Sequence, residues 1–384
     1  MHSFLVAAEI VAWLVTLAGL AYYVLCLWSA IAFLQRPHIE TALTAPPVSI
    51  LKPLKGTDPE IYQSFRGHCL QDYPEYEIIF GVNEPSDPAI AIVEQLIREF
   101  PDRAIRILVC PERLGTNLKV SNLVQMQRVA KYEHLLVNDS DIRVPADYLR
   151  RVMSELGAPG TGLVTCLYRG VSAPTLGSRL ESLGISTDFC TGVLVAQQLE
   201  GSLRFGLGST LAFRRSELQQ IGGFEALGDY LADDYELGRR IAALGQRVHL
   251  SSTVVETYLP AYDLGGFFRH QLRWARTIRD ARRWGYVGLG LTFGLPWALL
   301  AVALHPAWAS CGLLGCTLLL RLAVALVVGR RVLRDPRVLS RLWLIPLRDL
   351  AALLVWGVSF TGHSVSWRGD SFTLKDGKLA RIIQ

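Results

Sequence analysis

Long apolar stretches stand at both ends of the chain. Residues 4–34 are almost wholly apolar, with Glu9 the only charged side chain among them. A membrane-spanning helix needs about 20 apolar residues, so this stretch predicts a helix that crosses the membrane. It is too long for the apolar part of a signal peptide and lacks a small-residue cleavage site, which indicates a retained anchor. Arg36 and His38 follow it, and positive flanks favour the cytoplasmic side for the next segment.

The apolar pattern returns towards the C-terminus and divides into three candidate spans. They are residues 286–304, 308–328 and 342–360. The loop at 329–341 carries five arginines, which marks it as cytoplasmic. The first two spans are therefore expected to leave and re-enter the cytoplasmic face as a hairpin. Pro346, Arg348 and Asp349 interrupt the third, so this segment either crosses the membrane or forms a re-entrant loop.

Between these regions, short β-rich runs alternate with helical stretches from Val48 to about Glu256. The runs are residues 48–51, 77–82, 105–109 and 135–137. Asp58-Pro59 and Asp87-Pro88 predict helix starts, because an acidic cap and a following proline suit a first turn. The alternation is typical of βαβ units, so we predict an α/β fold with a mostly parallel sheet. Ligands of such sheets bind beyond the carboxyl ends of the strands.

These patterns divide the chain into five segments. They are a transmembrane anchor at 1–36, a catalytic domain at 45–262, a basic interfacial helix at 263–285, a transmembrane region at 286–362 and a polar tail at 363–384.

The net charge of +5 resides in arginines near the apolar segments, which favours a membrane surface as partner and not nucleic acid. The seven cysteines show no CxxC or Cys/His spacing, which speaks against a zinc site or a disulfide framework. The excess of Arg over Lys is typical of a GC-rich bacterial genome, so we expect a multi-pass protein of a bacterial inner membrane with a cytoplasmic catalytic domain.

Carboxylates follow two of the predicted strands, where ligands are expected. Asp139 and Asp141 come directly after the run at 135–137. Two carboxylates one residue apart can share a divalent cation that neutralises a diphosphate, although an Asp-rich turn has the same composition. Asp87 follows the run at 77–82, where its oxygens suit the N–H and O–H groups of a nucleotide or simply cap the next helix.

A third acidic site, the pair Asp233 and Asp234, lies between a glycine-rich loop and a helical stretch. A single-displacement sugar transfer needs a carboxylate that takes the proton of the acceptor hydroxyl. The alternative role is an acidic helix start that interacts with the helix dipole.

The basic helix at 263–285 carries Arg269, Arg273 and Arg276 on one face. Such a stripe is typical of an interfacial helix on anionic lipid headgroups. Arg273 and Trp274 differ from the rest, because an Arg fork suits a diphosphate and an indole suits a sugar or lipid face.

Together and in this order, the motifs resemble those of the inverting glycosyltransferases of the family 2 type, which have the GT-A nucleotide-sugar fold. The chain is most similar to the ceramide glucosyltransferase branch and its bacterial relatives in hopanoid biosynthesis. The resemblance runs nearly end to end through residues 49–56 (SILKPLKG), 72–77, 87–90, 117–123, 139–140, 142–144, 234–235, 273–274 and 367–369.

The resemblance implies a role for each matched residue. They are nucleotide contact for Asp87, metal and diphosphate binding for Asp139, the catalytic base for Asp234, and the end of a Q/R-x-x-R-W motif for Arg273-Trp274, with Lys119, Asp233 and His270 as further substrate-binding candidates. Asp141 completes a DxD motif and a two-carboxylate metal site here, where the ceramide enzymes can carry glycine. His270 stands where the motif has Gln or Arg, which leaves the role of this side chain open. The implied partners are a UDP-sugar, Mg²⁺ or Mn²⁺, and a lipid alcohol in the bilayer.

For the acceptor, the bacterial composition favours a hopanoid polyol such as bacteriohopanetetrol, and the resemblance implies N-acetylglucosamine from UDP-GlcNAc as the sugar. Transfer of glucose to ceramide is the alternative. A processive polysaccharide synthase needs more spans, and a transporter needs polar spans around a midplane site. A non-catalytic membrane scaffold that binds a sugar nucleotide would be expected to lack Asp139 or Asp234, and both are present. The sequence leaves the metal identity and the oligomeric state open.

Overall fold

The computed structural model describes residues 2–36, 45–367 and 370–381. The chain forms two compact units. The membrane unit comprises Met1–Arg36, Ser172–Leu199 and Ala261–His363, and the sheet unit comprises Pro37–Val171, Glu200–Pro260 and Ser364–Gln384. The expected catalytic domain at 45–262 is thus divided, because Ser172–Leu199 belongs to the membrane unit.

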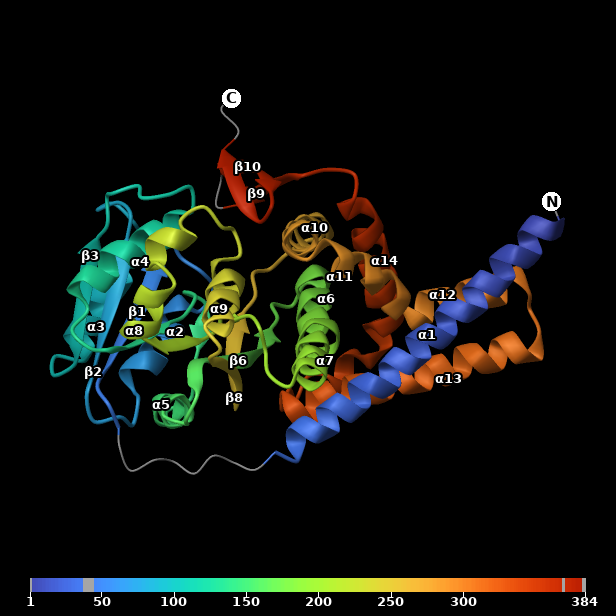
Figure 1. Cartoon of the computed structure of the whole chain (residues 1–384), viewed down its shortest axis with the longest axis horizontal. Helices are drawn as coiled ribbons and strands as arrows, with labels where there is room; N and C mark the ends of the chain where they lie inside the picture. Colours follow the sequence, from blue (N-terminus) through green and yellow to red (C-terminus); the bar gives the residue numbers. More distant parts are fainter. Residues whose placement is uncertain (1, 37–44, 368–369, 382–384) are drawn as a thin grey trace. The chain divides into compact units, whose positions relative to one another are not determined.

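The sheet unit is built on an eight-stranded sheet (Figure 1). The strand order is β3 (Ala104–Val109), β2 (Tyr76–Val82), β1 (Val48–Leu54), β4 (His134–Val137), β7 (Leu211–Arg214), β6 (Thr161–Val171), β8 (Arg247–Tyr258) and β5 (Ile142–Arg143). The first four strands are parallel, β7 is antiparallel to both neighbours, and β6 is parallel to β8. The predicted α/β class is confirmed, and the sheet is mixed.

The strand order creates a topological switch point between β1 and β4. Both β1 and β2 are buried at every position, as expected for parallel strands covered on both faces. From β1 the chain continues to β2 on one side and later returns to β4 on the other, so their connections diverge beyond the carboxyl ends. Ligands of open α/β sheets bind at such a switch point. The helices of this unit are α2 (Ile61–Cys69), α3 (Ala89–Glu99), α4 (Leu118–Val129), α5 (Tyr148–Leu156), α8 (Arg215–Gln220) and α9 (Asp233–Ala243).

One of the two predicted helix starts is confirmed. Helix α3 begins directly after Asp87-Pro88, and Asp87 Oδ1 accepts the N–H of Ala89 at 2.9 Å. The start expected at Asp58 is wrong, because α2 begins at Ile61 without a side-chain cap. The Asp58 carboxylate instead accepts the Ser140 hydroxyl, next to Asp139.

The C-terminal segment expected as a polar tail forms a three-stranded antiparallel sheet. Its strands are β9 (Ser364–Trp367), β10 (Asp370–Lys375) and β11 (Lys378–Arg381). Alternating apolar positions bury Phe372 and Leu374 against Leu231, and the Leu379 N–H donates to the Asp229 carbonyl at 2.7 Å. This sheet therefore supports the loop that leads into α9. Arg368 and Gly369, named in the resemblance, lie outside the described residues.

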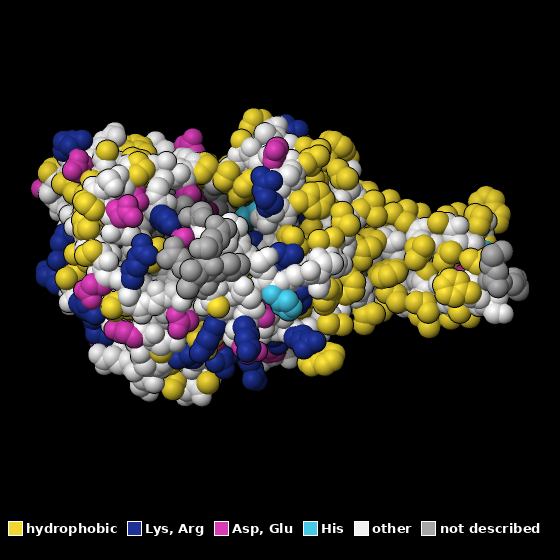
Figure 2. All heavy atoms as spheres, turned by 90° about the horizontal axis from the view of Figure 1, so that it is seen from above, with side chains coloured by type: hydrophobic (Ala, Val, Ile, Leu, Met, Phe, Trp, Pro, Cys, Tyr) yellow, Lys and Arg dark blue, Asp and Glu magenta, His cyan; other side chains and the backbone are white. Residues whose placement is uncertain are grey.

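Among the described residues, the membrane unit contains three helices long and apolar enough to cross a membrane. They cover Ser3–Leu34 (within α1, His2–Leu34), Trp308–Val332 (α13, Trp308–Ala325, with a π-helical end) and Leu339–Ser359 (a 3₁₀ turn and α14, Ile345–Ser359). The candidate span at 286–304 is a bent pair of helices, because Arg283–Thr292 and Gly294–Leu304 (α12) meet at 51°. Figure 2 shows hydrophobic side chains covering the surface over α1, α12 and α13, as a lipid-facing surface requires.

The interrupted third span is accommodated within a continuous helix. Pro346 lies in the first turn of α14, where its missing N–H has no helical partner to lose. Asp349 pairs with Arg321 of α13 at 2.7 Å, and Arg348 pairs with Asp188 at 3.3 Å. These buried charges are paired, as ionisable groups within membrane helices are expected to be.

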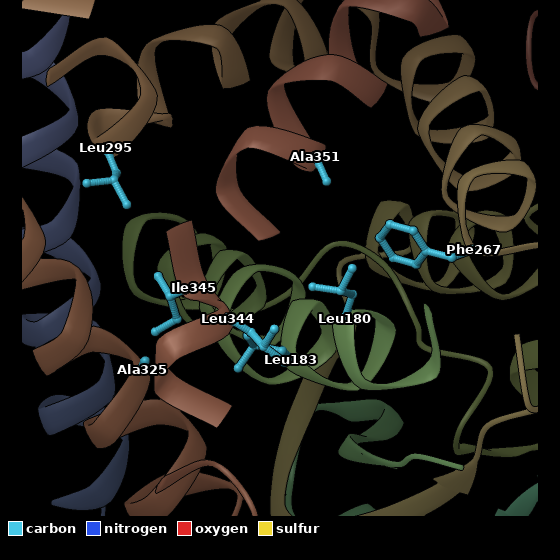
Figure 3. Close-up of a cluster of buried hydrophobic side chains, with 8 residues drawn as sticks. All are labelled: Leu180, Leu183, Phe267, Leu295, Ala325, Leu344, Ile345 and Ala351. Carbon is cyan, nitrogen blue, oxygen red and sulfur yellow. The ribbon is translucent and has the colours of Figure 1, made fainter. Parts of the chain in front are cut away.

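Four further helical segments complete the membrane unit. They are α6 (Leu176–Gly184) with a π-helical turn (Ile185–Phe189), α7 (Cys190–Glu200), α10 (Leu264–Ala281) and α11 (Arg283–Gly288). Leu180, Leu183 and Phe267 pack with Leu344 and Ile345 in the core shown in Figure 3. The apolar core therefore joins the basic helix α10 to α6 and α14.

Helices α1 and α12 cross at two glycines, and this crossing makes a testable prediction. A Cβ on Gly19 would lie 2.4 Å from the Gly294 Cα. The Gly19→Leu variant is expected to lose about 1–3 kcal/mol of stability through overpacking, read as a lower unfolding temperature in detergent. The matched control is Gly312→Leu on α13, where a Cβ meets nothing within 4 Å. Equal unfolding temperatures for both variants would contradict the crossing.

Candidate functional site

Asp139 lies directly beyond the carboxyl end of β4, at the switch point of the sheet. Its backbone N–H donates to the Gly208 carbonyl at 3.0 Å. Its Oδ1 lies 2.8 Å from the Nζ of Lys119, in the first turn of α4, and its side chain remains 42% exposed. The carboxylate is therefore held from one side and open to a ligand on the other.

Lys119 joins two of the predicted acidic sites. Its Nζ also lies 3.0 Å from Asp233 Oδ2. Burial alone would lower the pKa of Lys119, but the carboxylates of Asp139 and Asp233 outweigh it and raise the pKa above its usual range. Asn117 caps α4 by accepting the Lys119 N–H at 3.0 Å, and it donates to the Tyr230 carbonyl at 2.8 Å. The start of α4 is thus fixed against the loop that precedes α9.

Asp234 occupies the first turn of α9 and faces the same glycine as Asp139. Its Oδ2 accepts the Gly208 N–H at 2.7 Å, and its Oδ1 accepts the Tyr235 N–H at 2.7 Å. Burial and the neighbouring Asp233 raise the pKa of Asp234 to about 6. A carboxyl group with such a pKa is suited to accept a proton near neutral pH.

Gly208, which the sequence reasoning missed, brings Asp139 and Asp234 together. A Cβ at this position would lie 2.4 Å from Asp139 Oδ2 and 3.3 Å from Asp234 Oδ2. Asn138 fixes the adjacent loop, since its buried amide donates to the Ser209 carbonyl at 2.6 Å and to the Tyr148 hydroxyl at 2.9 Å. No local pattern marks this glycine, because its role depends on contacts made across the fold.

The Gly208→Ala variant is expected to lose activity because the added methyl group displaces one of the two carboxylates. A misplacement of about 1 Å can lower a rate about 10²-fold, so we expect a large fall in kcat for the sugar transfer that the sequence resemblance implies. Gly192→Ala, where a Cβ meets nothing within 4 Å, is the control. Activity in Gly208→Ala equal to that of the control would show that the contact is unimportant.

Asp141 completes the DxD motif near Lys52. This buried lysine entered the sequence analysis only as part of the matched block 49–56. The Thr257 hydroxyl donates to Asp141 Oδ2. Burial and the nearby charge of Asp139 raise the pKa of Asp141 to about 6. Lys52 is fully buried and donates from Nζ to the Asp139 carbonyl at 3.1 Å. Burial lowers the pKa of Lys52 to about 7 against the pull of these carboxylates.

The donor chemistry of this pair fits a hard divalent cation. Asp139 and Asp141 offer carboxylate oxygens close enough for their charges to repel, which a bound cation would relieve. Within the described part of the chain, no group of three His, Cys, Asp or Glu side chains is arranged to hold a metal. Two carboxylates are the number that Mg²⁺ commonly takes from a protein when phosphate oxygens and water supply the remaining ligands.

Asp87 uses both carboxylate oxygens within the sheet unit. Besides the Ala89 N–H, it accepts the Gly56 N–H at 2.9 Å through Oδ2. Gly56 has φ of +72°, a conformation that favours glycine, in the block that follows β1. The capping role is therefore observed, and the nucleotide contact remains a prediction.

The remaining predicted residues lie on α10 in the membrane unit, each with partners there. Arg273 Nη2 lies 3.0 Å from His270 Nε2, and the Trp274 ring lies 5.3 Å from the His270 ring and 5.7 Å from that of Phe189. Arg279, which was not singled out in the sequence, is buried and donates to the Ser359 carbonyl and, at 2.7 Å, to the Gly362 carbonyl. It thus satisfies the C-terminal end of α14, where a cation is favourable.

Known proteins are similar to this chain in sequence and in fold. A family model described as "Glycosyl transferase family 21" matches residues 11–380. "Ceramide glucosyltransferase 1" of Caenorhabditis elegans is 28% identical over 68% of this chain and 58% of that protein. "Ceramide glucosyltransferase" of Komagataella phaffii is 34% identical over 40% of this chain and 30% of that protein. The chain thus spans about half, or less, of the length of these relatives.

A solved structure confirms the predicted GT-A glycosyltransferase fold. It is the mannosyltransferase PcManGT of Pyrobaculum calidifontis, solved with GDP-Man and Mn²⁺, which superposes with a TM-score of 0.55 at 22% identity over 92% of this chain and 97% of that one. At this identity the likeness concerns the fold alone. The sequence match extends from the first membrane helix to the C-terminal strands, and the chain belongs to glycosyl transferase family 21.

Proposed function

We propose that this protein transfers a sugar from a UDP-sugar to a hydroxyl group of a membrane lipid. The observation that carries the proposal is the placement of Asp139 and Asp234 on one glycine, Gly208, with Lys119 beside them. One carboxylate suits the donor diphosphate and the other suits the acceptor hydroxyl. The apolar helices of the membrane unit and the ceramide glucosyltransferase relatives support a lipid acceptor.

In this proposal the protein binds the donor through residues of the sheet unit. Asp87 contacts the nucleotide, and Lys119 provides positive charge near the diphosphate. Asp139 and Asp141 hold a divalent cation, Mg²⁺ or Mn²⁺, which when bound supplies electrostatic stabilisation of the leaving diphosphate. Asp233 keeps Lys119 in place through the contact at 3.0 Å.

Asp234 acts as the general base. Its carboxylate takes the proton of the lipid hydroxyl while the hydroxyl oxygen bonds to the anomeric carbon. The bond from that carbon to the diphosphate breaks, and UDP leaves with the electron pair from the opposite face. The anomeric configuration is therefore inverted. Arg273 stabilises the charge that develops on the leaving group, and Trp274 contacts the sugar or the lipid.

The relatives favour a sphingolipid-like acceptor such as ceramide, with glucose as the sugar. The sequence composition favours a hopanoid polyol and the family resemblance favours N-acetylglucosamine, and this pair is the second outcome of the test. Arginine-rich flanks of the membrane spans favour a cytoplasmic catalytic face, and the excess of Arg over Lys favours a bacterial inner membrane.

The test combines purified protein, Mn²⁺ and a UDP-sugar with vesicles that contain ceramide, a hopanoid polyol or neither. We expect UDP release that depends on an acceptor lipid and a product lipid heavier by one sugar in mass spectrometry. UDP release without a glycolipid product would contradict transfer to a lipid, and no release with any lipid would contradict the proposal and favour a non-catalytic scaffold.

The pH dependence of transfer follows from the state of Asp234. Its carboxyl group must be ionised to accept a proton, and burial raises its pKa to about 6. We therefore expect kcat to fall as the pH drops below that value, because the protonated form cannot act as a base. A kcat that stays constant down to pH about 5 would exclude a base with this raised pKa.

A further inference from the structure

His270, which departs from the family motif, lies between Arg273 and a buried carboxylate of another helix. Its Nε2 is 3.0 Å from Arg273 Nη2, and its Nδ1 is 3.1 Å from Glu181 Oε1 on α6. We infer that Glu181, acting through His270, positions Arg273 for the leaving diphosphate. The inference rests on the proposed function of Arg273.

The contacts determine which ring nitrogen of His270 carries the proton. A guanidinium group has no acceptor, so Arg273 donates and Nε2 accepts. The proton then lies on Nδ1, which donates to Glu181. A doubly protonated ring would place two donors face to face across the 3.0 Å contact with Arg273. His270 therefore works as a neutral bridge that accepts at one end and donates at the other.

Glu181 is fixed in place by the residue next to His270. Its side chain is fully buried, and both its oxygens accept from Gln271 Nε2, at 3.0 Å and 2.9 Å. Gln271 Oε1 in turn accepts from Arg348 of α14 at 2.9 Å. Gln271 of α10 therefore holds both carboxylate oxygens of Glu181, and Arg348 of α14 holds Gln271 in turn.

The His270 ring is also held from its faces. The Tyr262 ring stacks on it at 5.3 Å with an interplanar angle of 23°, and Trp274 lies 5.3 Å away. His270 and Arg273 are three residues apart on α10, so their side chains lie on the same face of the helix. Contacts with these two aromatic rings restrict the His270 ring and thereby limit the orientations that Arg273 can adopt.

This arrangement accounts for histidine at the first position of the motif. A glutamine can make the same two contacts, because its amide oxygen accepts from Arg273 and its amide nitrogen donates to Glu181. An arginine cannot accept from Arg273. The geometry therefore predicts that glutamine, and not leucine, replaces His270 in function.

The kinetic test compares His270→Gln, His270→Leu and Glu181→Gln. We expect His270→Gln to retain kcat, His270→Leu to lower kcat by about 10–100-fold, and the Michaelis constant for the lipid to stay unchanged in both. Glu181→Gln, which removes the charge from the end of the bridge, is expected to lower kcat as well. If His270→Leu keeps the wild-type kcat, or if His270→Gln loses as much as His270→Leu, the positioning role is overturned.

A spectroscopic measurement separates this inference from the proposed function. In ¹⁵N-histidine-labelled wild-type protein, the signal absent from His270→Gln identifies His270 among the eight histidines. We expect a neutral ring protonated on Nδ1, whether or not the protein makes a glycolipid. A ring protonated on Nε2 would overturn the bridge even if transfer is observed. Absence of transfer with the Nδ1 form present would overturn the proposed function and leave the bridge intact.

Discussion

Replacing Asp234 by asparagine is expected to lower kcat for glycolipid formation by about 10²–10⁴-fold, the usual contribution of a general base. Asparagine has nearly the same shape and keeps an oxygen that can accept from Gly208 or Tyr235, but it cannot take the proton of the acceptor hydroxyl. Donor binding should change little, because Asp139 and Lys119 are intact. Initial rates and calorimetric binding of UDP measure the two effects separately.

Glu236→Gln is the matched control for this substitution. Glu236 lies in the same first turn of α9, but its oxygens contact Arg239 and Arg240 at 2.8 Å. We expect this variant to transfer sugar at close to the wild-type rate. Full turnover by Asp234→Asn, or an equal loss in Glu236→Gln, would remove Asp234 from the mechanism.

The second large effect is expected for Asp139→Asn, through loss of donor binding. The substitution removes one of the two carboxylates offered to the cation and one of the two that surround Lys119. We expect kcat/KM for the UDP-sugar to fall about 10²–10³-fold, as for loss of a group that stabilises the leaving charge. The concentration of Mn²⁺ needed to restore activity after chelation should rise as well.

Asp147→Asn controls for loss of a negative charge close in sequence. Asp147 pairs with Arg151 at 2.6 Å on the surface of α5, and 46% of its side chain is exposed. We expect this variant to show the metal dependence of the wild type. Chelation that leaves wild-type transfer unaffected would contradict a divalent cation at Asp139 and Asp141.

Two of the predicted site residues, Asp139 and Asp87, lie at the end of an apolar run. Asp139 follows β4, and Asp87 follows β2, so the strand pattern alone places them where ligands bind. The role of Asp234 needed the family resemblance, because a helix start with two acids is common. Its proximity to Asp139 depends on Gly208, which lies 69 residues further along the chain than Asp139 (208 − 139) and has no local signal.

The errors arose where long-range packing decides local structure. The break near Phe293 divides an apolar stretch that by composition alone is long enough to span a membrane. Pro346 and Asp349 left open whether the third candidate span crosses the membrane or is re-entrant, and in the structure the first turn of α14 accommodates the proline while Arg321 pairs with the acid. The C-terminal strands were missed because their short alternating pattern is stabilised by Leu231 from a distant loop.

The anomeric configuration of the product tests the central claim most directly. Purified protein would convert an α-linked UDP-sugar and a lipid alcohol in vesicles, and NMR of the isolated glycolipid would report the linkage. The account predicts a single β-linked sugar on the lipid hydroxyl, because Asp234 activates that hydroxyl for one displacement at the anomeric carbon. An α-linked product, or UDP formed with no sugar on the lipid, would contradict it.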